Sequence, residues 1–350
     1  MLSRVLHRKP KGQPNSFFIL RNNGLGDLLC VTPLFQMLRQ NFPDARIVAG
    51  IGSWHQDLLD NDPHLTECLT VNAPWHNQFK VSSNFLGILV YIFFSQEARS
   101  LARKKFDVGI DVVGSIWGSL LLIRCGIPLR VGVKGYAGGH SATQLFLDYD
   151  PNKHVSQACL EMGRLLQINN MPEPKPQIFL TAEESVFGES AWQKGSQAKR
   201  IVMAPGGSFE EKCWGDENFS TLLNLILQHS EHQIRIIGGK DDMARIGIAE
   251  LPRKFSHRCL DLSGKLSLRQ SAGLVSSCDF VISNSSVAMH FAGAFSIPSL
   301  ILLGEWYESA KLHHRQWGYP ESTVIGKECR CGKNSIPEAN EAFAIFQQLS

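Results

Sequence analysis

The sequence lacks several features that define large classes of protein. Its longest apolar run, Phe85–Phe94, has about half the length that a membrane-spanning helix needs. Residues 1–15 are basic and contain proline, but they hold no apolar stretch of the kind found in secretory signals. Long low-complexity tracts and short internal repeats are also lacking. We therefore expect a cytoplasmic protein, for which contact with a membrane surface stays open.

An excess of one charge and paired cysteines are equally lacking. The 35 basic and 32 acidic residues leave a formal net charge of +3, too little to indicate bulk binding of nucleic acid. The nine cysteines are dispersed and form no C-x-x-C pair, which fits a reducing compartment better than a disulfide framework. With 43% hydrophobic and 19% charged residues over 350 positions, the chain is long enough for two globular domains.

Short apolar segments alternate with segments of helical period along most of the chain. The expected strands cover residues 17–21, 46–50, 68–71, 107–113, 130–133, 200–204, 233–237, 280–283 and 299–303. The expected helices cover residues 27–41, 85–105, 115–125, 216–228, 267–276, 287–295 and 337–350. Strands that alternate with helices predict parallel sheets with covering helices, an α/β fold.

A proline-rich segment divides this pattern into two halves. Three prolines stand within five positions at the end of residues 169–176, where they exclude regular helix or a central strand. The expected organisation is a basic tail (1–15), a first Rossmann-like domain (16–170), a linker (171–176), a second Rossmann-like domain (177–330) and a C-terminal helix (331–350).

The first candidate site segment is residues 21–27, between a strand and a helix. Gly24 and Gly26 allow a sharp turn and a close approach of the backbone to a ligand. Asp27 stands in the first turn of the expected helix, where the helix dipole favours the carboxylate, and a carboxylate there can act as a general base. A simple helix-capping role is the alternative for Asp27.

The second segment is residues 204–214, which again follow a strand. Gly206, Gly207 and Ser208 offer backbone amides and a hydroxyl to phosphate oxygens, and Lys212 offers a positive charge. A plain surface loop is the commoner explanation of such a pattern. The P-loop motif G-x-x-x-x-G-K-[ST] does not occur in the segment.

The third segment, residues 283–290, leads from a strand into a helix. Asn284, Ser285 and Ser286 are small polar residues that both cap a helix and present N–H groups to an anion. His290 follows about one turn later. A histidine in this position is more often structural than catalytic.

Together the three segments resemble, in order and spacing, the signature blocks of glycosyltransferase family 9, the lipopolysaccharide heptosyltransferase family. The resemblance runs from about Phe17 to Gly304. It rests on the following strings: Gly24-Leu-Gly-Asp27, Thr32-Pro-Leu34, Leu38-Arg39, Asn41-Phe-Pro-Asp-Ala45, Pro205-Gly-Gly-Ser208 with Lys212 and Trp214, Gly238-Gly239, Asp261-Leu-Ser-Gly-Lys-Leu-Ser-Leu268 and Asn284-Ser-Ser-Val-Ala-Met-His290.

The resemblance implies a GT-B fold, two Rossmann-like doubly wound domains facing across a cleft, with acceptor bound mainly by the first and donor by the second. It implies an inverting, metal-independent transfer, typically of heptose from ADP-heptose to an inner-core sugar, with the nucleotide sugar as substrate and no cofactor. Asp27 is then the base, and Lys212 holds the donor phosphates. The remaining donor-binding residues are Gly206, Gly207, Ser208, Gly238, Gly239, Asp242, Asn284, Ser285, Ser286, Met289 and His290.

The expected acceptor side comprises Gly24, Gly26, Arg124, Arg130 and Lys134. The three basic residues cluster in sequence, where family members often bind acidic core sugars or phosphates, although a solvated basic loop explains them equally well. The apolar residues 84–94 favour a buried core helix, and the alternative is a helix that rests on the inner membrane near a lipid-linked acceptor.

Two departures from the family pattern keep other functions open. Ser285 and Val287 stand where aspartate and glycine are usual, so a donor linked to UDP or GDP, an epimerase, or a weakly active or non-catalytic member are alternatives. An oxidoreductase is disfavoured, because G-x-G-x-x-G does not follow the first strand. Two D-x-D strings precede prolines at 63 and 151 and indicate turns rather than a metal site. Cys329 and Cys331 are too sparse for a zinc site, even with His313 and His314.

Overall fold

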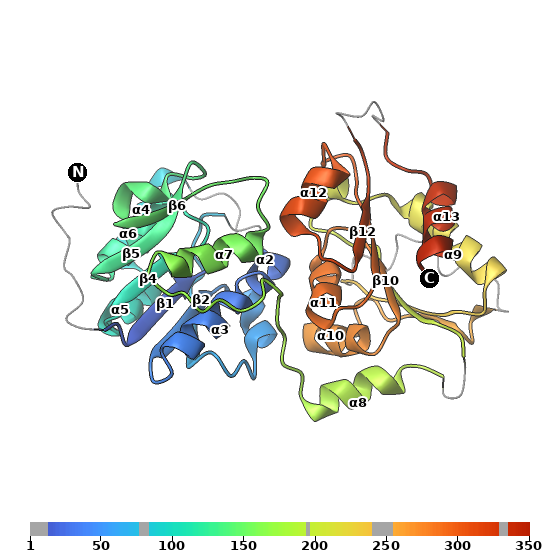
Figure 1. Cartoon of the computed structure of the whole chain (residues 1–350), viewed down its shortest axis with the longest axis horizontal. Helices are drawn as coiled ribbons and strands as arrows, with labels where there is room; N and C mark the ends of the chain where they lie inside the picture. Colours follow the sequence, from blue (N-terminus) through green and yellow to red (C-terminus); the bar gives the residue numbers. More distant parts are fainter. Residues whose placement is uncertain (1–12, 77–83, 194–196, 240–254, 329–334) are drawn as a thin grey trace. The chain divides into compact units, whose positions relative to one another are not determined.

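The computed structural model describes residues 13–76, 84–193, 197–239, 255–328 and 335–350. The chain forms two compact units, Met1–Phe179 and Leu180–Ser350 (Figure 1). The expected linker, residues 171–176, lies shortly before this division, and the domain boundaries inferred from the sequence stay predictions.

The first unit contains a parallel sheet of six strands in the order β3-β2-β1-β4-β5-β6. Its strands are β1 (Ser16–Leu20), β2 (Arg46–Ile51), β3 (Glu67–Thr70), β4 (Val108–Asp111), β5 (Leu129–Lys134) and β6 (Leu145–Asp148). Its helices are α2 (Leu25–Leu29), α3 (Thr32–Asn41), η1 (Ser53–Leu59), α4 (Phe85–Phe94), α5 (Gln96–Arg103), α6 (Ile116–Arg124), η2 (Gly139–Ala142) and α7 (Val155–Arg164). The strand order reverses its direction between β1 and β4.

The second unit repeats this topology in a sheet of order β12-β11-β10-β7-β8-β9. Its strands are β7 (Arg200–Ala204), β8 (Gln233–Ile236), β9 (Cys259–Asp261), β10 (Phe280–Ser283), β11 (Ser299–Leu302) and β12 (Ser322–Ile325). Its helices are α8 (Ala182–Ser190), η3 (Glu210–Lys212), α9 (Asp216–His229), α10 (Leu268–Ser276), α11 (Val287–Phe295), α12 (Ala310–Trp317) and α13 (Ala339–Leu349). Counted along each half, both sheets have the order 3-2-1-4-5-6 of doubly wound Rossmann-like folds. The expected α/β class is confirmed.

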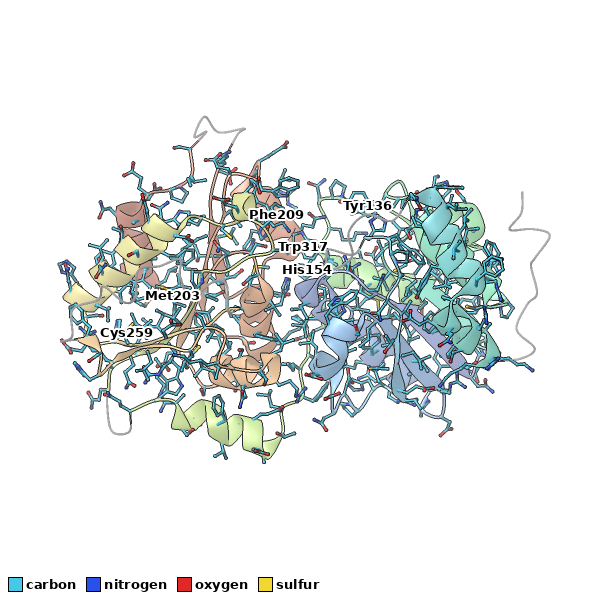
Figure 2. All side chains as sticks on the ribbon, turned by 180° about the vertical axis from the view of Figure 1, so that it is seen from behind. Tyr136, His154, Met203, Phe209, Cys259 and Trp317 are labelled. Carbon is cyan, nitrogen blue, oxygen red and sulfur yellow. The ribbon has the colours of Figure 1, made fainter. Side chains whose placement is uncertain are left out.

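Each sheet is covered by helices through an apolar core. In the first unit, Phe18, Leu20 and Val48 of the sheet pack with Ile92 of α4 and Leu121 of α6, and α3 and α7 pack against each other elsewhere in the unit. In the second unit, α9 and α13 pack on one face of the sheet, whose interior residues include Met203 (Figure 2). These cores form because strands buried on both faces are continuously apolar.

Two helices expected from the sequence are each broken in two. Residues 27–41 form α2 and α3, because Pro33 stands in the first turn of α3 and cannot continue a helix from the preceding residues. Residues 85–105 form α4 and α5, because Ser95 is extended and its side chain accepts a hydrogen bond from Ala98 N as the cap of α5. The two halves of this second pair meet at 41°.

The interpretation of residues 84–94 as a buried core helix is wrong for most of α4. Only Ile88 and Ile92 of this helix are buried. Phe85 is 65% exposed and Leu86 is 67% exposed, and three further apolar side chains of α4 also face outwards. Among the described residues, no single helix is long and apolar enough to span a membrane; α4 and α5 together pass that test by length and composition as a bent pair.

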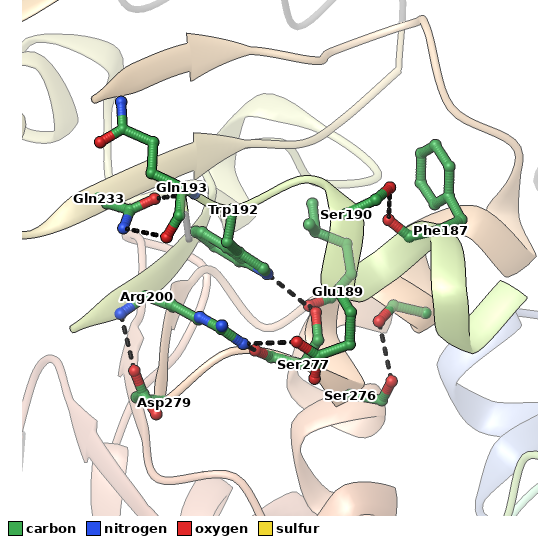
Figure 3. A network of polar contacts seen from close by, with 12 residues as sticks. Phe187, Glu189, Ser190, Trp192, Gln193, Arg200, Gln233, Ser276, Ser277 and Asp279 are labelled. Atoms are coloured by element: carbon green, nitrogen blue, oxygen red, sulfur yellow. Dashed lines mark hydrogen bonds and ion pairs between the residues drawn. The ribbon is translucent and has the colours of Figure 1, made fainter. Parts of the chain in front are cut away.

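Helix α8 and the turn after it are joined to the second sheet by a polar network (Figure 3). Arg200 at the start of β7 forms an ion pair with Glu189 at 2.8 Å, and its backbone N–H donates to Asp279. The Trp192 indole donates to Ser277 at 2.9 Å. These bonds explain why α8, which begins directly after the division, belongs to the second unit.

Candidate active site

The doubly wound topology identifies where each unit can bind a ligand. In such sheets ligands bind at the carboxyl ends of the strands, at the switch point where the strand order reverses. The switch points lie between β1 and β4 in the first unit and between β7 and β10 in the second. Segment 21–27 follows β1, segment 205–214 follows β7 and segment 284–290 follows β10. All three candidate segments therefore lie at a switch point.

Asp27 is held by an arginine at the first switch point. Arg21 Nη2 donates to Asp27 Oδ1 at 2.7 Å, with the two side chains 8% and 26% exposed. Helix α2 has only five residues, so this ion pair, rather than a long helix dipole, is the main local support for the carboxylate. A Cβ atom on Gly24 would lie 2.3 Å from Asp27 Oδ2, so glycine is required there by the packed carboxylate.

Further polar side chains lie near this carboxylate, namely His55, Trp54 and Asn22. His55 is fully buried, and its burial lowers its pKa to about 4, so the ring is neutral near pH 7. Trp54 Nε1 donates to Asn23 O at 3.2 Å and braces the loop. Asn22 is buried, and neither polar atom of its amide has a hydrogen-bond partner within the described residues. Such an amide is costly to bury alone, which makes Asn22 a candidate for contact with a ligand.

Asp111 is a second carboxyl group at this switch point, and the sequence interpretation missed it. It ends β4, is fully buried, and accepts a hydrogen bond from Ser115 N at 2.8 Å. Burial raises its pKa to about 7, although the backbone amides of Ser115, Gly114 and Val113 and the charge of Arg21 oppose this rise. The sequence signal for Asp111 was an aspartate at the end of an apolar strand. Whether that aspartate is buried depends on the positions of β5 and α6, which the sequence pattern does not give.

The loop of Lys212 is fixed by a buried amide at the second switch point. Asn284 Nδ2 donates to the carbonyl oxygens of Pro205 and Gly206, and Asn284 Oδ1 accepts from Trp214 N at 2.9 Å. Lys212 Nζ lies 5.0 Å from the centre of the Phe209 ring, which Figure 2 labels. Both polar atoms of the Asn284 side chain are used within the protein, so we assign it to holding the loop rather than touching the donor.

A histidine from α12 reaches the same switch point. His313 Nε2 lies 2.8 Å from Ser285 Oγ, and within the described part of the chain its Nδ1 has no partner although it is buried. Burial, followed by the charges of His290 and Lys212, lowers its pKa to about 3. His313 is therefore a neutral ring beside the phosphate-binding candidates. The pairing with Ser285 was not predicted, because the two residues lie far apart in the sequence.

Two expected donor-binding side chains are buried away from the loop surface. Met289 is fully buried in a core cluster with Ile301 and Leu303. His290 is also buried; its Nδ1 lies 2.6 Å from Tyr319 Oη, and its ring packs edge-on against Trp317, labelled in Figure 2. Both residues can position the start of α11, and their assignment to donor binding stays a prediction.

The basic residues of the expected acceptor side do not form one cluster. Lys134 ends β5 and lies at the carboxyl edge of the sheet, whereas Arg124 and Arg130 lie before or at the start of that strand. Arg130 is buried, and its guanidinium donates to the carbonyl oxygens of Ile127 and Ala142. Parallel strands separate their two ends by about 3.3 Å per residue, so only Lys134 is at the ligand-binding edge.

Of the remaining predicted site residues, some lie at the carboxyl edge of the second sheet and others lie outside the described residues. Gly238 and Gly239 follow β8 at the carboxyl edge and are exposed. Asp242 lies outside the described residues, as do Cys329 and Cys331. Among the residues that the structure describes, no group of three or more His, Cys, Asp or Glu side chains is arranged to hold a metal ion.

Comparison with known proteins gives a consistent result. The model of the family described as "Glycosyltransferase family 9 (heptosyltransferase)" matches residues 95–317. Lipooligosaccharide heptosyltransferase 2 of Haemophilus ducreyi is 24% identical over 298 residues, which cover 80% of each chain. The solved structure of Escherichia coli ADP-heptose lipopolysaccharide heptosyltransferase II has a TM-score of 0.73 at 19% identity and covers 95% of this chain and 98% of its own.

A second solved structure, a family 9 glycosyltransferase from Veillonella parvula, has a TM-score of 0.76 at 16% identity and covers 98% of this chain and 99% of its own. At these identities the two structural likenesses show the fold alone. The GT-B class expected from the sequence is confirmed.

Proposed function

Since the chain belongs to glycosyltransferase family 9, the heptosyltransferase family, and is a glycosyltransferase, we propose that it transfers heptose from ADP-heptose to a sugar of a lipopolysaccharide core. The observation that carries this proposal is the family match over residues 95–317, which includes the Lys212 loop and the start of α11. The similar E. coli structure is described as an ADP-heptose enzyme, which supports the choice of donor.

In the proposed reaction, Asp27 accepts the proton of the acceptor hydroxyl. The acceptor oxygen forms a bond to the anomeric carbon of the donor while the bond from that carbon to the diphosphate oxygen breaks, so the configuration inverts. ADP leaves with the electron pair of the broken bond. The Arg21–Asp27 ion pair at 2.7 Å supports this role, because it fixes the carboxylate while Asp27 remains partly exposed.

Lys212 and the backbone around Gly207 stabilise the charge that develops on the leaving diphosphate. The first turn of α11, with Ser286 as the extended cap residue, adds the positive end of the helix dipole. Asn284 supports this arrangement by fixing the loop before Lys212, as its bonds to Pro205 and Gly206 indicate. Fixed positive groups of this kind act without reorganisation during the reaction.

The acceptor in this proposal is a saccharide linked to lipid, reached by peripheral contact of the enzyme with the inner membrane. A cytoplasmic location stays a prediction. A donor linked to UDP or GDP, an epimerase and a non-catalytic member are less favoured, because the family match and the curated relatives all name heptosyltransferases.

The test is a transfer assay with the purified full chain, ADP-heptose and a core oligosaccharide that lacks heptose. We expect ADP release that depends on the acceptor, and a product whose new glycosidic bond has the opposite anomeric configuration to the donor by NMR. Equal turnover with UDP-linked or GDP-linked sugars would contradict the choice of donor. A lack of transfer with all three donors, together with no nucleotide-dependent rise in melting temperature, would contradict the catalytic proposal.

A further inference from the structure

Helix α4 carries a continuous apolar surface that the first unit does not bury. We define the α4 face by its exposed side chains: Phe85, Leu86, Val90, Phe93 and Phe94. Three of the five are at least 65% exposed, and none of the residues of α4 is charged. Five large apolar side chains on one helix exceed the scattered exposure that is normal for a protein surface.

The opposite side of α4 is fixed to the core of the first unit, so the helix cannot turn this face inwards. Ile88 and Ile92 are buried in the cluster that also contains Phe18 and Leu20 of β1. Tyr91 packs edge-on against Trp75. This burial also excludes α4 from crossing a bilayer while the unit is folded. A helix in this state can only lie on a surface.

Positive charges border the α4 face at the end of the helix. Arg99 Nη2 donates to Phe94 O at 2.7 Å, and Arg124 lies close enough to donate to Phe93 O at 3.5 Å. Arg103, one turn after Arg99 on α5, is also exposed. The guanidinium groups of Arg99 and Arg124 therefore stand beside the two phenylalanines that end the face.

The acidic residue nearest in sequence does not balance these arginines at the surface. Glu97 accepts hydrogen bonds from Tyr91 Oη at 2.5 Å and from Asn72 N at 2.9 Å, and is thereby turned towards the protein. The α4 face is thus apolar with a basic border. That combination matches an anionic bilayer, whose interface offers acyl chains to apolar side chains and phosphates to arginines.

A shallow hollow extends the face on one side. It has a volume of about 360 Å³ and is lined by Pro74, Gly87, Val90, Tyr91, Phe94 and Ser95. Its walls are mostly apolar, so it suits a hydrocarbon group rather than a sugar. A second copy of the chain would bring a second set of arginines to the same border, where like charges repel.

We propose that the α4 face, together with Arg99, Arg103 and Arg124, docks the enzyme on the surface of an anionic lipid bilayer. This inference rests on the proposed function in one respect: a lipid-linked acceptor gives the contact its purpose. The contact itself is a physical property of the first unit and is measured without any transfer reaction.

The experiment measures flotation of the full chain with vesicles of phosphatidylethanolamine and phosphatidylglycerol, and with vesicles of phosphatidylcholine alone. We expect binding to the anionic vesicles that weakens as salt is raised, since screening removes the contribution of the arginines. The double variant Phe85→Ser/Leu86→Ser should lower the bound-to-free ratio by about tenfold or more. Arg99→Gln/Arg124→Gln should lower it on anionic vesicles and leave the weaker binding to phosphatidylcholine unchanged.

Matched controls distinguish binding by the α4 face from nonspecific binding by other exposed apolar or basic residues. Val186 on α8 is 67% exposed, as Leu86 is, and Val186→Ser should leave binding unchanged. Arg164→Gln removes an exposed arginine from the end of α7 and should have little effect. Equal binding by the wild type and the Phe85→Ser/Leu86→Ser variant would overturn the proposal, as would a wild type that does not float with anionic vesicles at low salt.

Two further measurements keep the outcomes distinct. Sedimentation of the wild type should show no concentration-dependent dimer that Leu86→Ser abolishes; such a dimer would assign the face to a second copy and overturn the proposal. Transfer to a water-soluble core oligosaccharide should be the same for the wild type and the Phe85→Ser/Leu86→Ser variant. Vesicle binding without any transfer would contradict the proposed function while leaving the docking surface intact.

Discussion

The two switch points have the same topology and opposite chemistry. The first carries two carboxyl groups, Asp27 and Asp111. Arg21 forms an ion pair with Asp27, and its positive charge also acts on Asp111. The second carries Lys212 and the neutral ring of His313. Both follow the same strand order, so the difference comes from the side chains that the two units place at these points. A shared fold therefore fixes where a ligand can bind, and the side chains there decide the chemistry, for which we propose proton acceptance at the first point and phosphate binding at the second.

The largest expected effect separates the two switch points by function. Asp27→Asn keeps the shape of the side chain but removes its capacity to accept a proton, so kcat should fall by about a thousandfold. ADP affinity, measured by calorimetry, should stay within about twofold, which calorimetry resolves readily. Asp44→Asn, an exposed aspartate in the same unit, is the control and should retain normal turnover. Near-normal turnover of Asp27→Asn would remove Asp27 as the base.

A smaller effect is expected from the phosphate side. Lys212→Gln should weaken ADP binding by about tenfold and lower kcat by about a hundredfold, because the positive charge acts on both bound and departing diphosphate. Isothermal titration and single-turnover rates measure the two effects separately. Lys311→Gln on α12, which removes an exposed lysine of the second unit, should change neither. If Lys212→Gln lowered turnover but left ADP affinity intact, its assignment to the ground-state phosphates would be wrong.

Arg21 tests whether the first switch point needs its ion pair. Arg21→Gln should lower kcat by about tenfold with KM for the donor unchanged, because Asp27 loses the group that orients it. Arg21→Lys should recover most of the rate, since a lysine can still pair with Asp27. A purely structural role for Arg21 predicts a fall in melting temperature in both variants and no recovery of rate by lysine.

The smallest expected effects concern pH and stability, and they have opposite signs in the two units. The raised pKa of Asp111, about 7 when folded against 3.8, means that its contribution is present below pH 4 and is lost as pH rises to about 7. The lowered pKa of His313, about 3 against 6.5, means that its contribution is present above pH 6.5 and is lost as pH falls towards 3.

Melting curves of two variants measure these contributions. Between pH 4 and pH 7 the melting temperature of Asp111→Asn should rise relative to the wild type, because the variant has no carboxyl group to ionise. Over the same range the melting temperature of His313→Gln should fall relative to the wild type. Unfolding of the wild type at pH 4 lets His313 bind a proton, which lowers stability, and this loss disappears as pH rises to 7; the variant has no such group. The same pH trend in both variants would refute the contrast.

The sequence predicted the fold better than it predicted the contacts of the site. Buried parallel strands occur in the sequence as short apolar runs, and this pattern predicted most strands of both sheets. Edge strands such as β6 and β12 have mixed polarity and were missed. The helix breaks at Pro33 and Ser95 had local signals, namely a proline in a first turn and a serine cap, which the helical period outweighed.

At the site, the segments were predictable and the side-chain roles were not. Glycine and small polar residues after a strand indicate a binding loop locally, so Asp27, Lys212 and Ser285 could be proposed from the sequence, and their roles stay predictions. Arg130 looked like a surface cation, but its burial against the carbonyls of Ile127 and Ala142 depends on the loop before β6. His313 and Asp111 gain their positions from packing between distant segments, which periodicity and motifs do not contain.

The amide of Asn284 has a thermodynamic consequence for the second unit. By joining Pro205, Gly206 and Trp214 through hydrogen bonds, it pre-organises the loop that we propose to bind the nucleotide while the chain folds. The entropy of ordering that loop is then not subtracted from the free energy of ligand association. We therefore expect ADP to bind to a loop that is already ordered, and its binding should leave the backbone of residues 205–214 nearly unchanged.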